Sequence, residues 1–129
     1  MSIEEPAKSY NLTFEEREGY LFAGVTGEAD NIEISSQYWK EIADKCKTDA
    51  IKKVLIVEDL PGGASMTDVY EVASALPQLG FFGIKIAFVD AHLDQQDVNE
   101  FGELVAVNRG LYGKIFNDVS EAEKWLLAD

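Results

Sequence analysis

Residues 54–68 read VLIVEDLPGGASMTD and begin with four consecutive apolar side chains. A half-exposed strand would alternate apolar and polar residues, whereas an unbroken apolar run indicates burial on both faces, as in a parallel sheet covered by helices. The run ends at Glu58-Asp59, a Pro-Gly-Gly turn follows, and Ser, Thr and Asp then lead into a helical pattern. The stretch therefore predicts a parallel strand, a loop and a helix.

Strand and helix patterns alternate on both sides of this stretch. Residues 9–16 and 20–27 have strand patterns, and the turn between them predicts an antiparallel hairpin. Apolar runs predict two more strands, and apolar spacings of three and four residues predict four helices. The further strands are expected at 84–89 and 112–116, and the helices at about 30–48, from 65–68 to Pro77, at about 95–108, and at 120–129.

The resulting order is β-β-α-β-α-β-α-β-α, an α/β fold. Right-handed crossovers between successive strands place those strands parallel and side by side. We therefore predict a mixed five-stranded sheet in which strands 2–5 are parallel and the N-terminal edge strand is antiparallel. The length of 129 residues fits a single domain spanning 1–129.

Individual residues predict where the helices end and which face they bury. Pro77 should end the second helix, because a proline inside a helix removes a hydrogen bond. The spacing Ser120…Glu123 predicts a capping box for the last helix. Cys46 lies in an apolar helical stripe and is expected to be buried. In the third helix the apolar residues are Val98, Phe101, Leu104 and Val105, and Gly110 is expected to cap its end.

Composition excludes several classes of function. The formal net charge of −13 disfavours binding to nucleic acids and to anionic membranes. A single cysteine, Cys46, excludes an intrachain disulfide and a multi-cysteine metal site. No cofactor is expected. No apolar run approaches the ~18 residues of a membrane span, and MSIEEPAKSY does not resemble a secretion signal. We therefore expect a cytoplasmic protein that is not inserted in a membrane.

Two stretches carry a family resemblance: GYLFAGVTGEA in the hairpin, and NRGLYGKIFNDVSEAEKWL from Asn108 onwards. Together with Trp39 in the first helix, they resemble the STAS fold of anti-sigma-factor antagonists. Within that group they resemble most the stage II sporulation AA-like (SpoIIAA-like) branch, whose fold is related to the CRAL-TRIO lipid-binding domain. The resemblance covers about residues 10–127 and implies a binding or signalling module that is not an enzyme.

The resemblance also bears on a serine. In the sporulation antagonists, a partner kinase phosphorylates a serine at the start of the helix after the central strand. The corresponding location is 62–68, where Ser65 is the candidate phosphorylation site. The family pattern has an aspartate before that serine, whereas Ala64 precedes Ser65, so this chain departs from the pattern.

The carboxyl ends of the predicted parallel strands are the expected binding site, because ligands of α/β sheets sit there. Residues 59–68 and 90–94 would form its rim. Physically, Ser65 or Thr67 is best explained as a helix cap that contributes about 1 kcal/mol. The predicted rim residues are Asp59, Ser65, Thr67, Asp68, Asp90 and His92.

A metal site is an alternative at the same edge. Asp59, Asp90 and Asp118 each follow a parallel strand, and converging carboxylates suit Mg²⁺ or Ca²⁺ in a phosphoacceptor or hydrolase. Aspartates at strand ends also begin turns and cap helices, and no diagnostic metal motif is present. His92 has no nucleophile partner that the sequence identifies, so a catalytic function is not favoured.

The remaining hypotheses concern what the module binds. A protein partner is one, and a small apolar ligand in a cleft lined by residues 81–83 and the apolar face of 98–105 is another. The third is a self-associating structural domain, with Phe81 or Phe82 exposed as the contact of a homodimer.

Overall fold

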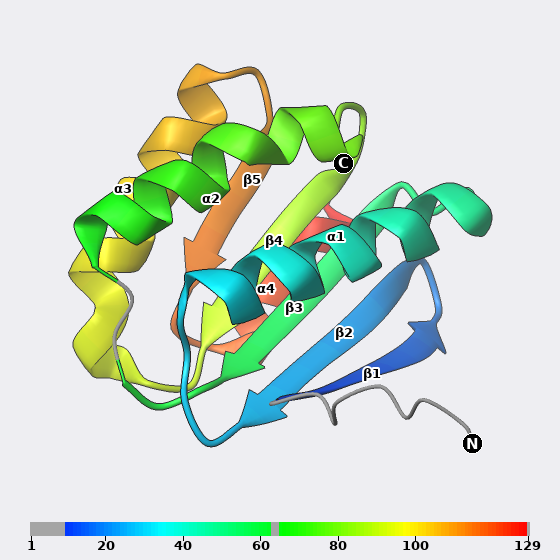
Figure 1. Cartoon of the computed structure of the whole chain (residues 1–129). Coiled ribbons are helices and arrows are strands. Elements are labelled where there is room, and N and C mark those ends of the chain that lie inside the picture. Colours follow the sequence, from blue (N-terminus) through cyan, green and yellow to red (C-terminus); the bar gives the residue numbers. More distant parts are fainter. Residues whose placement is uncertain (1–9, 63–64, 129) are drawn as a thin grey trace, which may run out of the picture.

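The computed structural model describes residues 10–62 and 65–128 (Figure 1). Its elements follow the predicted order, with one additional short 3₁₀ helix, η1. Residues 1–9, 63, 64 and 129 lie outside the described residues, and with them the predicted strand residue Ser9 and the predicted helix end at Asp129. The elements are β1 (Tyr10–Arg17), β2 (Tyr20–Gly27), α1 (Ile32–Thr48), β3 (Lys53–Asp59), α2 (Met66–Leu79), β4 (Lys85–Asp90), η1 (Leu93–Gln95), α3 (Gln96–Asn108), β5 (Tyr112–Phe116) and α4 (Val119–Leu127).

The sheet has the predicted mixed topology. Its strands lie in the order β1-β2-β3-β4-β5, with β1 antiparallel to β2 and all later pairs parallel. Glu58 pairs in register with Asp90, so the acidic ends of β3 and β4 lie side by side. The prediction of a five-stranded α/β sheet with parallel strands 2–5 is confirmed.

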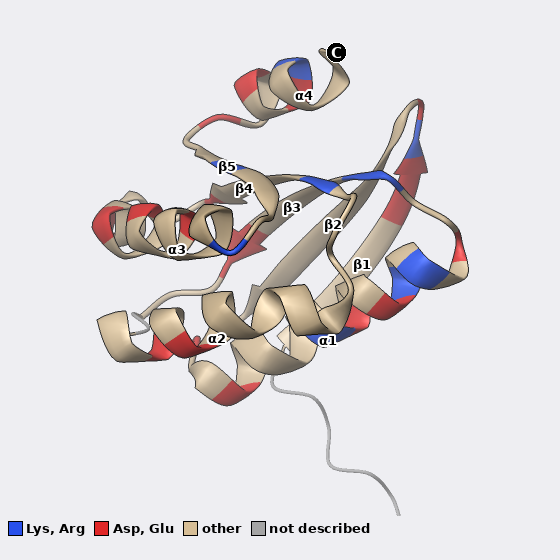
Figure 2. Ribbon diagram, turned by 90° about the horizontal axis from the view of Figure 1, so that it is seen from above, with Lys and Arg blue, Asp and Glu red and all other residues tan. Residues whose placement is uncertain are grey.

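Helices cover both faces of the sheet, in unequal numbers. Figure 2 shows α1, α2 and α3 on one side and α4 alone on the other. This arrangement follows from topology. From β2 to β5 each strand lies next to the one before it and on the same side, so every crossover runs in the same direction. Right-handed crossovers that all run in one direction place their helices on the same face of the sheet. The unbroken apolar character of β3 is thereby explained: Val54 and Ile56 face the three helices, and Leu55 faces α4.

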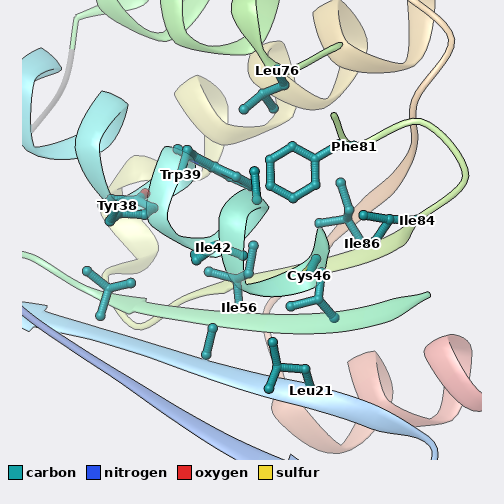
Figure 3. Close-up of a cluster of buried hydrophobic side chains, with 14 of the residues drawn as sticks. Leu21, Tyr38, Trp39, Ile42, Cys46, Ile56, Leu76, Phe81, Ile84 and Ile86 are labelled. Carbon is teal, nitrogen blue, oxygen red and sulfur yellow. The ribbon is translucent and has the colours of Figure 1, made fainter. Parts of the chain in front are cut away.

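The larger of two apolar clusters lies between α1 and the sheet (Figure 3). Ile42 and Cys46 of α1 are fully buried against Leu21 and Ile56 of the strands, which confirms the predicted burial of the cysteine. Burial also raises the pKa of the Cys46 thiol to about 11. Trp39 extends the cluster, because its ring stacks on Phe88 at a centroid distance of 5.9 Å.

Two predicted helix boundaries are wrong. Pro77 does not end α2, which continues to Leu79 and stops at Gly80 in the left-handed conformation, with φ 104°. The stop signal is therefore Gly80, whose backbone amide donates to the carbonyl oxygen of Pro77. The cap of α4 is Asp118, whose carboxylate accepts from the amides of Ser120 and Glu121, and the proposed Ser120–Glu123 capping box is absent.

The apolar face of α3 also differs from the prediction. Leu104 is 57% exposed, and the buried residues of the helix are Val105 and Ala106. The 3.6-residue period places Leu104 and Val105 100° apart, and only the second position faces the sheet. Gly110, with φ 94°, follows the C-cap residue Arg109 and ends the helix as predicted.

Candidate binding cavity

A cavity of about 110 Å³ lies between the three helices and their face of the sheet. Its walls are largely apolar, and polar residues line it from the loop before α1, from α1, α2, η1 and α3, and from the strands β3 and β5. The apolar lining residues include Ile32, Trp39, Val69, Val72, Ala73, Leu76, Ile86, Phe88, Val98, Ala106, Leu111 and Ile115.

Small side chains on facing elements line this space. Ala73 of α2, Ala106 and Gly102 of α3, and Gly113 of β5 are all lining residues. At Gly102 the two helices approach so closely that an added Cβ would lie 2.9 Å from Cγ1 of Val69. The helices therefore touch at this glycine, while small residues leave room between them and the sheet.

Glu58, the last residue but one of β3, forms the polar end of the cavity. It is only 3% exposed, and its carboxylate accepts a hydrogen bond from the hydroxyl of Tyr38 on α1. Burial, and secondly the charge of Asp30, raises the pKa of Glu58 to about 8. Burial and the same carboxylate also raise the pKa of Tyr38. Glu58 and Tyr38 thus form a buried, hydrogen-bonded pair of polar side chains at one end of a mainly apolar space.

Two further carboxylates lie beside this pair. Asp30 accepts a hydrogen bond from the Ser35 hydroxyl at 2.8 Å, and burial raises its pKa. Asp90 accepts from Asn99 Nδ2 and from the backbone amide of His92, each at 2.8 Å, and burial raises its pKa as well. The charges of Asp30 and Asp90 both act on Glu58, so these three acids form one electrostatic cluster.

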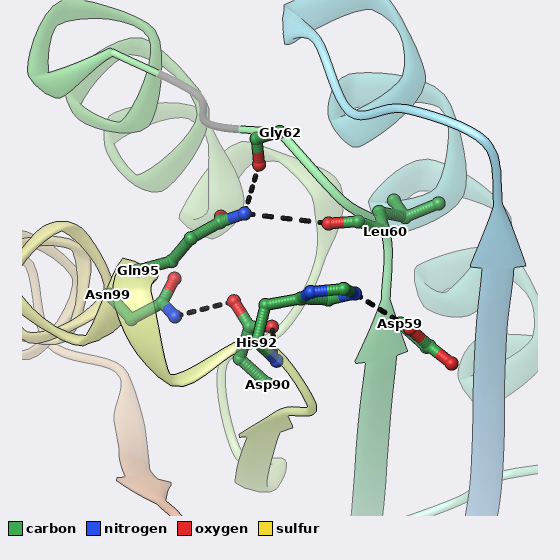
Figure 4. A network of polar contacts seen from close by, with 7 residues as sticks. All are labelled: Asp59, Leu60, Gly62, Asp90, His92, Gln95 and Asn99. Atoms are coloured by element: carbon green, nitrogen blue, oxygen red, sulfur yellow. Dashed lines mark hydrogen bonds and ion pairs between the residues drawn. The ribbon is translucent and has the colours of Figure 1, made fainter.

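Side-chain contacts join the two predicted rim loops (Figure 4). The ring Nε2 of His92 lies 2.8 Å from Oδ1 of Asp59 across the end of the sheet. The buried Gln95 amide donates to the carbonyl oxygens of Leu60 and Gly62. The loops after β3 and β4 are therefore held together above the carboxyl edge of the sheet.

The structure distributes the predicted rim residues over different environments. Only Asp68 lines the cavity. Asp59 and His92 contact each other outside it, and Asp90 lies beside it, bonded to Asn99. Ser65 is the N-cap of α2 and accepts from the amide of Asp68 at 3.1 Å, whereas Thr67 is exposed in the first turn.

The alternative metal ligands do not come together. Among residues 10–62 and 65–128, no three His, Cys, Asp or Glu side chains are grouped so that they could hold a metal ion. Asp118, the third candidate, caps α4 on the other face of the sheet.

Most of the residues at the polar end of the cavity were missing from the predicted rim. The sequence marks Glu58 only as a strand end, and Tyr38 is not among the predicted rim residues. One available signal was the strand period of two, which places Glu58 on the same face as Val54 and Ile56, toward the three helices. Asp30 and Asn99 have no comparable signal, because loop geometry and helix orientation position them.

The predicted aromatic contacts are partly wrong. Phe81 is fully buried and contacts Trp39 edge-to-face, at a centroid distance of 5.5 Å, so it cannot be a dimer contact. Phe82 is 59% exposed. Neither residue lines the cavity, whereas Val98 of the proposed cleft does.

No family model matches the sequence, and no curated protein matches it either. Solved structures do resemble the fold. An anti-sigma factor antagonist from Mycobacterium paratuberculosis superposes with a TM-score of 0.63 at 12% identity, covering 93% of this chain and 96% of its own. A DUF3478 protein with a SpoIIAA-like fold from Shewanella loihica gives 0.55 at 14% identity, covering 97% of this chain and 99% of its own.

These likenesses show that the chain has the SpoIIAA-like fold, as the resemblance in the sequence predicted. The relationship to CRAL-TRIO domains stays a prediction. Within the described residues, no helix combines the length and apolar character that crossing a bilayer requires.

Proposed function

We propose that this protein is a non-enzymatic binding module that takes a small, mainly apolar ligand in the cavity beneath α1, α2 and α3. The observation that supports this proposal is an apolar space of about 110 Å³ with one buried polar end, formed by Glu58 and Tyr38. Protein interiors are normally packed without such voids. Apolar pockets with a few convergent polar groups are typical ligand sites.

The size of the cavity sets the size of the ligand. A cavity of about 150 Å³ accepts benzene, so a smaller group of roughly four carbons suits this one. Ligand binding would couple the helices to the sheet, because α1, α2, α3 and the strands β3, β4 and β5 all contribute lining residues. This coupling is a physical route by which a regulatory module could report its ligand to a partner.

Methyl NMR with small branched probes tests the proposal. We expect saturable shifts at lining methyl groups such as those of Val72 and Leu76, and loss of binding in Ala73→Leu, which fills the space. Ala75→Leu is the matched control, because it adds the same atoms to the same helix at a residue that does not line the cavity. If no probe, charged or neutral, shifts the lining methyl groups, the proposed function is wrong.

A second candidate is a regulator that binds a protein and is modified at Ser65. The supporting observation is that Ser65 is exposed at the start of α2, immediately after the loop that follows β3. A phosphoryl group there would face the positive end of the helix dipole. Mass spectrometry of protein from its own cells tests this: phosphate on Ser65 supports the candidate, and its absence under all growth conditions contradicts it.

Self-association is the third hypothesis, with exposed Phe82 as the predicted contact. Native mass spectrometry would show both a homodimer and a retained small molecule. A dimer that Phe82→Ser converts to a monomer would support this hypothesis.

A further inference from the structure

The fifth strand forms one open edge of the sheet. Among the described residues, β5 pairs with β4 alone, so its other side presents backbone donors and acceptors to the outside. Such an edge is a template for pairing with a strand of another chain, and charged side chains are one device that prevents it. The opposite edge strand, β1, carries Glu15, Glu16 and Arg17, whereas β5 (YGKIF) carries only Lys114.

A helix side chain closes part of the β5 edge. The carboxylate of Glu103 on α3 accepts a hydrogen bond from the backbone amide of Ile115 at 2.8 Å. That amide therefore points away from β4, toward the side where a further strand would offer it a carbonyl oxygen. The Glu103 carboxylate thus occupies the place of the backbone acceptor of a sixth strand.

Exposed apolar side chains flank the same edge on both faces of the sheet. Val107 lies one helical turn after Glu103, on the same side of α3, and is exposed. On the other face, the exposed Tyr112 at the start of β5 contacts the ring of Trp125 on α4. The side chains of an added strand point alternately to the two faces. Such a strand would therefore cover both Val107 and Tyr112 while its backbone pairs with β5.

The charge of this region suits a second copy of the chain. Copies that each carry a formal net charge of −13 repel one another. Residues 104–117 contain Arg109 and Lys114 but no Asp or Glu, so two copies meet along β5 with little repulsion. A carboxylate at Glu103 adds repulsion there, so this residue closes the edge by its charge as well as by its hydrogen bond.

We propose that β5 is a strand-pairing edge that Glu103 holds closed, and that its partner is β5 of a second copy of this chain. Two antiparallel β5 strands related by a two-fold axis match donors to acceptors, and such isologous pairs are the commonest assembly of identical chains. The pair would join two five-stranded sheets into one. The inference goes beyond the proposed function, because it needs no ligand in the cavity and uses a contact other than Phe82.

Replacement of Glu103 by alanine opens the edge. We expect analytical ultracentrifugation of the full chain to show dimerisation about 100-fold tighter than in the natural protein, because each of the two copies is freed from a hydrogen bond worth about tenfold. The Ile115 amide should exchange quickly in the dilute variant and slowly in the concentrated one, since strand pairing protects it. In the natural protein its exchange should not depend on concentration.

Matched variants separate loss of the acceptor from loss of charge or packing. Glu103→Gln keeps an acceptor oxygen for the Ile115 amide, so it should dimerise far less than Glu103→Ala. Glu103→Met keeps the length of the side chain and removes the acceptor oxygen, and it keeps the test available if Glu103→Ala does not fold. Glu100→Ala removes one charge from the same helix at an exposed residue, and it should behave as the natural protein does.

Second changes in Glu103→Ala test the contact itself. Backbone groups alternate along a strand, so the amide of Gly113 points outward like that of Ile115, and a proline is tolerated at such an edge position. Gly113→Pro should therefore restore the monomer, whereas Phe82→Ser should leave the dimer intact.

Three outcomes would overturn the inference. The first is a monomer in both Glu103→Ala and Glu103→Met, and the second is a dimer that Phe82→Ser dissociates. The third is a series of species larger than the dimer, because two paired β5 edges leave no β5 edge for a third copy. Each of these outcomes would leave the proposed ligand binding in the cavity intact.

Discussion

At the scale of single residues, Glu58 gives the fold a distinctive pH dependence. Its pKa is about 8 in the folded protein against an ordinary value of 4.5, mainly because of burial. The folded state therefore holds the proton more tightly than the unfolded state. The stability contributed by the neutral form is fully present below about pH 4.5 and is lost as the pH rises through about 8, by about 1.4 kcal/mol for each pKa unit.

Comparison of Glu58→Gln with the natural protein isolates this contribution. Tyr38, Asp30 and Asp90 are the ionisable groups that act on Glu58, and the pKa values of both aspartates are raised, which gives the same sign. We expect urea unfolding between pH 5 and pH 8.5 to show a decline of a few kcal/mol in the natural protein, and a smaller decline in the variant. Parallel curves for the two proteins would contradict the buried-proton account.

Ser65 is the residue whose structural role can be measured most directly. Its hydroxyl accepts from the amide of Asp68 at 3.1 Å, so Ser65→Ala leaves that amide without its cap. We expect a loss of about 1 kcal/mol in the free energy of unfolding. Thr67→Ala is the control, since Thr67 is exposed and makes no capping contact. An equal loss in both variants would mean that Ser65 is not the effective cap.

At the scale of elements, Lys85 attaches α4 to the sheet. Its buried ammonium donates to the carbonyl oxygens of Trp125 and Ala128, at 2.6 and 2.7 Å, and lies 4.5 Å from the Trp125 ring centre. A cation at the end of a helix satisfies the last carbonyls and interacts favourably with the dipole. Lys85, the first residue of β4, thus holds the C-terminus of α4. Among the described residues, α4 is the only helix on the second face of the sheet.

Replacement of Lys85 by methionine keeps the apolar stem and removes the donor. We expect a loss of about 2 kcal/mol, because hydrogen bonds that involve a charged group contribute about 1.5–3 kcal/mol. Hydrogen exchange should increase selectively in α4, since that helix loses its attachment. Lys52→Met at an exposed lysine is the control. Increased exchange across all helices alike would indicate a general loss of stability instead.

At the scale of the whole molecule, the topology was predictable and the cavity was not. Strand order follows from alternating patterns and from the handedness of crossovers, and the unbroken run 54–57 correctly indicated helices on both faces. The cavity depends on Ala73, Ala106 and Gly113 meeting across three elements, and each of these is an ordinary small residue in its own segment. Helix ends were only partly predictable, because two local signals compete at each of them. At the end of α2 the signals are Pro77 and Gly80, and at the start of α4 they are Asp118 and Ser120.

Net charge is a property of the whole chain with its own consequence. A formal charge of −13 on 129 residues destabilises the compact state through self-repulsion. Salt screens such repulsion, with a Debye length of about 30 Å at 0.01 M and about 8 Å at 0.15 M ionic strength. We therefore expect the thermal unfolding midpoint to rise between 10 and 150 mM NaCl, as measured by circular dichroism.

A variant of reduced charge shows whether repulsion is the cause. Glu18, Glu28 and Glu71 are exposed, and none of them lines the cavity. Changing all three to glutamine lowers the negative charge without disturbing the polar end of the cavity, so the midpoint at low salt should rise and its salt dependence should flatten. An unchanged salt dependence would contradict repulsion among these surface charges as its cause, and the buried cluster of Asp30, Glu58 and Asp90 would not explain it either, because salt screens buried charges less than exposed ones.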